Sequence, residues 1–157
     1  MAQEKAEWTS DPTSRLLILH PFPGPRPEMV PKVLQKLLLL SVAGALGTLA
    51  RYEIAGLVQR IAGASFPLGT FVVNVAGCFV AGLLWALFEA RWAVTGETRI
   101  IVLVGFMGAF TTFSAFILET SELLRASQWF YAGLNLILQN ALGISALFLG
   151  AFLGRSV

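Results

Sequence analysis

Charged residues are scarce in this chain and make up 13% of its 157 residues, about half the share of an ordinary soluble domain. Hydrophobic residues account for 56%, and the mean hydropathy is +0.74. The formal net charge is only +2 and the basic residues are scattered, which excludes a basic patch for nucleic acid. The composition therefore predicts a multi-pass protein of the cell (inner) membrane, with the lipid bilayer as its surroundings.

Cysteine is also rare in this chain, and ionisable side chains are rare within its apolar segments. Cys78 is the single cysteine and falls in an apolar segment, which excludes a disulfide and a cysteine metal cluster and favours a packing role. Asp, Glu, His and Lys are absent from the centres of the apolar segments. This removes the usual proton carriers and leaves Ser and Thr without a general base. We therefore expect neither proton-coupled transport nor an enzyme.

Four long apolar stretches follow one another, at about residues 33–58, 67–88, 100–118 and 129–153. Each is long enough to cross a hydrocarbon core of about 30 Å as a helix. The pattern predicts an all-α integral membrane protein with four transmembrane helices in one domain, residues 33–157. Residues 1–32 are polar and rich in proline, which predicts a disordered N-terminal tail with Met29 as a candidate alternative start.

The third span departs from an ordinary apolar helix between residues 105 and 116. Gly105 and Gly108 each lower helix propensity by about 1 kcal/mol, and the hydroxyls of Thr111, Thr112 and Ser114 compete for backbone hydrogen bonds. We predict that this helix is broken near its middle. Backbone groups freed in lipid must be satisfied by protein, water or an ion, so the break is a candidate ion site. The alternative is an intact helix whose hydroxyls bond back one turn.

Polar side chains within the spans are mostly amides. Asn74 is costly to expose to lipid and is predicted to turn inward, where it either bridges helices or lines a pore. Asn135 and Gln139 lie one turn apart and present a polar track. Arg51, next to Tyr52 at the expected end of the first span, either anchors the helix at the interface or attracts an anion into a vestibule.

Phe110, Phe113 and Phe116 recur every third residue, which predicts that their rings share one face, either for packing or for contact with an ion. Ring edges are weakly positive, and amides and hydroxyls donate hydrogen bonds. This lining suits a small, strongly hydrated anion better than a cation. The neutral donors of this set are Asn74, Thr112, Ser114, Asn135 and Gln139.

Three segments resemble the Fluc/CrcB family of small four-helix fluoride channels. They are Gly-Ala-Leu-Gly-Thr-Leu-Ala-Arg-Tyr at 44–52, Gly-Thr-Phe-Val-Val-Asn at 69–74 and Gly-Phe-Met-Gly-Ala-Phe-Thr-Thr-Phe-Ser-Ala-Phe at 105–116. The resemblance extends over about residues 37–154. It implies an antiparallel, dual-topology homodimer that lets fluoride leave the cell passively, with a structural sodium ion (Na+) at the dimer centre.

The resemblance also implies a role for individual residues. The sodium would be held by the backbone carbonyls of Gly108 and Thr111. The fluoride path would contain Asn74, Phe113, Phe116, Ser114 and Thr112, and Arg51 would lie in a vestibule. Ala109 stands where the family often has glycine. Asn135 and Gln139 align where a tyrosine and a serine are expected, so we assign them to the pore wall as departures from the family.

Two other functions compete with a channel. A small four-helix multidrug exporter needs a membrane-embedded carboxylate. Glu53 lies beyond Arg51 near the expected helix end, which speaks against this function. A non-conducting assembly partner would be held by small-residue seams.

The basic residues are weakly biased to one side of the membrane, which is compatible with insertion in both orientations. On that side lie Lys32, Lys36, Arg91, Arg99 and Arg155, against Arg60 and Arg125 on the other.

Overall fold

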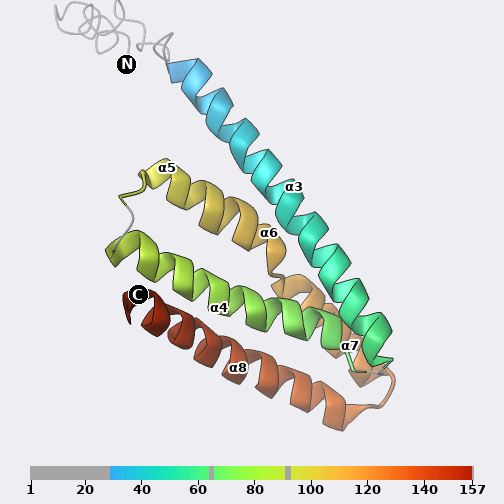
Figure 1. Cartoon of the computed structure of the whole chain (residues 1–157). Helices are drawn as coiled ribbons and strands as arrows, with labels where there is room; N and C mark the ends of the chain where they lie inside the picture. Colours follow the sequence, from blue (N-terminus) through green and yellow to red (C-terminus); the bar gives the residue numbers. More distant parts are fainter. Residues whose placement is uncertain (1–28, 64–65, 91–92, 157) are drawn as a thin grey trace, which may run out of the picture. The chain divides into compact units, whose positions relative to one another are not determined.

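The computed structural model describes residues 29–63, 66–90 and 93–156, so residues 1–28 of the predicted tail lie outside the described residues. The chain divides into two units, Met1–Gln35 and Lys36–Val157, and the packing described below belongs to the second. The long helices are α3 (Met29–Ala62), α4 (Leu68–Ala90) and α8 (Trp129–Ser156), as Figure 1 shows.

Four helical stretches are long and apolar enough to cross a membrane: Val30–Ala62, Leu68–Ala90, Gly96–Arg125 and Trp129–Ser156. They confirm the predicted all-α, four-span architecture. Two predicted boundaries are wrong. The first helix continues to Ala62, so Arg51 lies about three turns before its end instead of closing the span. The connection placed at residues 89–99 is shorter, because α4 includes Ala90 and the next helical turn begins at Gly96.

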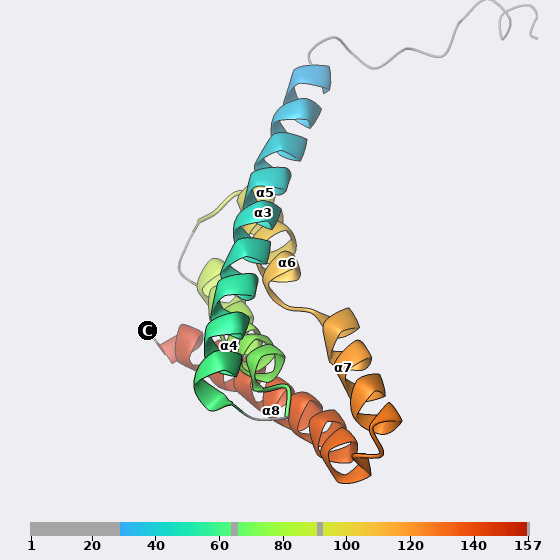
Figure 2. The same ribbon diagram turned by 90° about the vertical axis from the view of Figure 1, so that its right-hand side faces the viewer.

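The third stretch is built from four consecutive elements. α5 (Gly96–Arg99) begins where the Thr95 hydroxyl accepts a hydrogen bond from the N–H of Thr98, 3.2 Å away. The π-helix η1 (Ile100–Met107) and the short α6 (Gly108–Phe110) follow. Thr111 and Thr112 are then extended, with φ/ψ of −87°/155° and −148°/118°, before α7 (Phe113–Arg125) begins. In Figure 2 the chain leaves α6 and enters α7 along a displaced path.

Helices α4 and α8 run side by side in the same direction, with their backbones in contact (Figure 1). A Cβ added at Gly82 would overlap the carbonyl oxygen of Leu147, and one at Gly150 would overlap the carbonyl oxygen of Phe79. Such contacts need glycine, since any side chain would separate the helices. The register that they set places the first half of α4 beside the first half of α8, where both helices carry amides.

Helix α3 packs against the other helices through small residues of its own. A Cβ at Gly47 would overlap the carbonyl oxygen of Phe106, and one at Gly69 of α4 would overlap the carbonyl oxygen of Ala55. The core beneath them contains Val73, Met107 and Phe110, with Ala50 and Ala55 packed against it. Small residues of the first span, among them Gly47, Ala50 and Ala55, therefore pack against other helices.

Gly150→Ala should destabilise the protein, and Gly133→Ala in the same helix should not. The new methyl group at residue 150 meets Phe79 and Leu83 of α4, whereas nothing lies within 4 Å of a Cβ at residue 133. Overpacking of this kind costs about 1–3 kcal/mol, and Gly→Ala in an open helical position is neutral or stabilising. Thermal unfolding of both variants in detergent measures the difference. Equal Tm values would show that α4 and α8 are not in backbone contact.

Candidate functional site

The side-chain amide of Asn74 pairs with the backbone of Thr112 through two hydrogen bonds. The N–H of Thr112 donates to Oδ1 of Asn74 over 2.9 Å, and Nδ2 of Asn74 donates to the carbonyl oxygen of Thr112 over 3.1 Å. In a continuous α-helix the N–H of Thr112 would donate to the carbonyl oxygen of Gly108. Asn74 therefore takes the place of a helical hydrogen bond at the two extended residues, which are otherwise costly inside a membrane.

The hydroxyls of this segment serve different purposes. The hydroxyl of Thr111 donates to the carbonyl oxygen of Met107 over 3.0 Å, back by one turn. The hydroxyl of Thr112 accepts from the N–H of Ala115 over 3.2 Å and so caps the start of α7. It also lies 3.1 Å from the hydroxyl of Ser114, and either group can be the donor. In this pair of hydroxyls, either Thr112 or Ser114 can donate its proton to the other.

A chain of amides and hydroxyls leads away from Asn74 into α7 and α8. Nδ2 of Asn74 also donates to Oε1 of Gln139 over 2.7 Å. Nε2 of Gln139 donates to Oδ1 of Asn135 over 3.1 Å, and Nδ2 of Asn135 donates to the hydroxyl of Thr120 over 2.9 Å. Thr120 in turn donates to the carbonyl oxygen of Phe116 over 2.7 Å. Asn135 is fully buried, so the predicted polar track faces the protein interior.

A second polar contact lies beside this row of hydrogen-bonded side chains. The sequence analysis did not predict it. The hydroxyl of Thr70, one turn before Asn74, donates to Oε1 of Glu119, the residue next to Thr120. Oε2 of Glu119 is buried and has no hydrogen-bond partner among the described residues. Glu119 directly follows the apolar stretch 100–118, and a charged residue at the end of such a stretch usually lies at the membrane surface. The available signal was Thr70, which shares a helix face with Asn74.

A cavity of about 210 Å³ opens at the two extended residues. Phe113 is 72% exposed and Phe116 only 4%, and their rings meet edge to face with centroids 5.5 Å apart. Most residues of the predicted fluoride path thus line this one cavity, and Ser114 adjoins it through its hydroxyl contact with Thr112. The lining residues are Asn74, Cys78, Thr111, Thr112, Phe113, Phe116, Gln139 and Asn140.

Some predicted residues are not part of this cavity. Phe110 ends α6, stacks on Phe106 at 5.9 Å and belongs to the core, so the prediction that it shares a face with Phe113 is wrong. The three-residue rule fails because two extended residues separate the helices. Arg51 is half-buried in α3, and no hydrogen bond or ion pair joins it to another described residue. Cys78 lines the cavity in addition to its packing contact with α8.

Comparison with known proteins gives one consistent result. A family model described as CrcB-like protein, Camphor Resistance (CrcB), matches residues 38–151. A relative named fluoride-specific ion channel FluC, from Desulforapulum autotrophicum, is 62% identical over 122 residues, which cover 78% of this chain and 98% of the relative. A protein of the same name from Nitrosococcus oceani is 59% identical over 116 residues, or 74% and 93%. One from Nitratidesulfovibrio vulgaris is 51% identical over 128 residues, or 79% and 100%.

Asn74→Leu should lower the free energy of unfolding by about 1–3 kcal/mol, because it removes both partners of the Thr112 backbone at nearly constant side-chain size. Asn140→Leu is the matched control. Asn140 lines the same cavity, but its Nδ2 bonds the carbonyl oxygen of Leu136 in its own helix. Thermal unfolding in detergent should show a lower Tm for Asn74→Leu only. Similar Tm values for both variants would mean that Asn74 does not hold the extended segment.

Proposed function

Because this chain belongs to the CrcB-like protein family, we propose that it is a fluoride-selective ion channel that lets fluoride leave the cell passively and so lowers cytoplasmic fluoride. The observation that carries the proposal is the cavity at Thr111 and Thr112, where amides, hydroxyls and phenylalanine rings meet inside a membrane span. The relatives are named ion channels, and the proposal assigns this chain no enzymatic reaction.

The cavity has the chemistry that a small, strongly hydrated anion requires. Such an ion gives up water only where other hydrogen-bond donors replace it. The hydroxyls of Thr112 and Ser114 can rotate toward an ion, and the exposed ring edge of Phe113 is weakly positive. The amide of Asn74 already donates hydrogen bonds to Thr112 and Gln139. An ion beside it therefore competes with these two acceptors for the same N–H groups. None of these donors carries a fixed positive charge that would trap the ion.

We further propose that two copies assemble as an antiparallel homodimer with dual topology. Phe113 is largely exposed beside a polar cavity, and a second copy would enclose the path there. The weak basic bias between the two ends of the helices is compatible with both orientations. In this arrangement Arg51 is the vestibule residue, and Asn135 and Gln139 form the pore wall behind Asn74.

A structural sodium ion, not transported, would lie at the centre of this dimer on the backbone carbonyls of Gly108 and Thr111. The fit is supported by the hydrogen bonding of this segment, because the N–H of Thr112 bonds Asn74 and leaves the carbonyl of Gly108 without its helical donor. A two-fold axis would double two carbonyls into four oxygen ligands for a hard cation. The ion would supply the positive charge that holds the two interrupted helices together.

Two carboxyls favour the exporter alternative. Glu119 lies within the candidate span Gly96–Arg125, and Glu53 lies within the candidate span Val30–Ala62, so the prediction that Glu53 is near the helix end is wrong. Efflux from liposomes separates the two functions. A channel releases fluoride along its own gradient with no proton gradient, whereas an exporter moves organic cations only in exchange for protons. Cation export driven by protons, with no fluoride efflux, would replace the proposed function.

Phe113→Leu and Phe116→Leu test the rings. Both changes keep an apolar side chain and should cost under about 1.5 kcal/mol of stability. If the ring edges replace water around fluoride, loss of either ring should slow efflux by about two- to tenfold, since each ring interaction is worth about 0.5–1.5 kcal/mol. Phe130→Leu, at an exposed ring of α8 outside the cavity, is the control. Wild-type efflux per folded protein in both test variants would reduce Phe113 and Phe116 to packing residues.

Removal of sodium should lower both the Tm and the fluoride efflux of the purified protein, while replacement of potassium by another inert cation should change neither. Because the ligands are backbone carbonyls, Thr111→Ser should keep the sodium-dependent Tm. The double change of Thr111 and Thr112 to Ala favours a regular helix and should abolish it. Full efflux and an unchanged Tm in sodium-free protein would refute the sodium site.

A further inference from the structure

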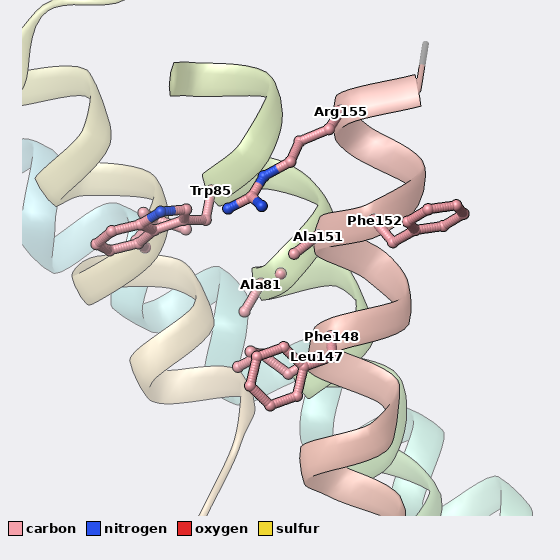
Figure 3. Close-up of a pocket in the computed structure, with 9 residues that line it drawn as sticks. Ala81, Trp85, Leu147, Phe148, Ala151, Phe152 and Arg155 are labelled. Atoms are coloured by element: carbon pink, nitrogen blue, oxygen red, sulfur yellow. The ribbon is translucent and has the colours of Figure 1, made fainter. Parts of the chain in front are cut away.

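A larger apolar groove lies away from the proposed channel, near the C-terminal end of α8. It has a volume of about 570 Å³ and is formed by α4, η1 and α8. Figure 3 shows Trp85 of α4 on one side and Phe148 of α8 on the other, while the ring of Phe152 extends from the opposite side of α8, away from Trp85. Trp85 is 55% exposed, and the two phenylalanines are 67% and 66% exposed. The groove thus offers wide aromatic walls to an occupant from outside the described chain.

The floor of the groove is held open by backbone contact. It consists of Ala81, Gly82 and Ala151, and a Cβ at Gly82 would overlap the carbonyl oxygen of Leu147. Because α4 and α8 already touch at this point, the helices cannot move closer to fill the space. A preformed apolar site of 300–1,000 Å³ is the size range in which proteins bind small molecules.

One positive charge lies at the rim. Arg155 is in the last turn of α8, and in Figure 3 its guanidinium extends over the groove toward Trp85. No hydrogen bond or ion pair joins it to another described residue. Arg99, by contrast, donates to the carbonyl oxygen of Phe88 and is engaged within the protein. The end of a membrane-spanning helix is where lipid headgroups lie, and tryptophan is favoured at the same level.

We propose that the groove binds an anionic phospholipid, with an acyl chain between Trp85 and Phe148 and the phosphate on Arg155. The apolar walls match the acyl chain, and the Arg155 guanidinium, to which no described residue is bonded, matches the charge of the headgroup. An arginine that merely snorkels to the interface would not require a preformed groove beneath it. The site is independent of fluoride and does not depend on the channel function.

The test uses the fluorescence of Trp85. The chain has four tryptophans, and changing Trp8, Trp92 and Trp129 to Phe leaves Trp85 as the reporter. The full chain is reconstituted into phosphatidylcholine vesicles that contain either dibromo-phosphatidylglycerol or dibromo-phosphatidylcholine, because bromine on an acyl chain quenches a tryptophan in contact. We expect quenching to saturate at about fivefold lower content of the anionic lipid, the preference that one arginine near a headgroup provides.

Two variants and a control decide the outcome. Arg155→Gln should bring the two brominated lipids to equal effect, and Ala151→Phe, which fills the floor, should lower quenching by both. Arg125→Gln removes an exposed arginine from the last turn of α7 and should keep the fivefold preference. The proposal is overturned if neither lipid quenches Trp85, which would mean that protein covers the groove. It is also overturned if the preference is absent or persists in Arg155→Gln.

Discussion

The site depends on the pairing between the Asn74 amide and the backbone of Thr112. Two extended residues within a membrane span leave an N–H and a C=O of Thr112 that the helix itself does not satisfy. One amide side chain satisfies both groups of Thr112, which lets the chain stop one helix at Phe110 and start another at Phe113. The exposed ring of Phe113, the capping hydroxyl of Thr112 and the cavity beside them all follow from that interruption.

The same amide links the interruption to the polar chain of α8. Asn74 uses both of its N–H groups, and its carbonyl oxygen accepts one hydrogen bond, so its donors are saturated within the protein. An anion beside Asn74 would have to replace one of its existing hydrogen bonds, because neither N–H group of the amide is free. Such an exchange costs little when each bond broken is replaced by another of similar strength. A saturated lining therefore remains stable without an ion and still offers donors to one.

Composition and periodicity predicted the four helices and the inward-facing amides, because lipid penalises exposed amides whatever their partners are. The partners required the register of α4 on α8, which glycine contacts set and which no single segment shows. The π-helix carries no mark in its sequence, since 100–107 is apolar on every side. Arg51 misled us about the end of α3, because one arginine does not end a helix whose apolar sequence continues.

The spacing of the Asn74 contacts along the chain has a consequence for biosynthesis. Thr112 follows Asn74 by 38 residues and Gln139 follows it by 65. At about 5–20 residues per second, the ribosome needs several seconds after Asn74 to complete its last partner. Until Gln139 has been synthesised, one N–H of the Asn74 amide lacks its partner in the nascent chain. An amide without its partner is costly in lipid, so α4 is less stable in the bilayer before α8 is added than after it.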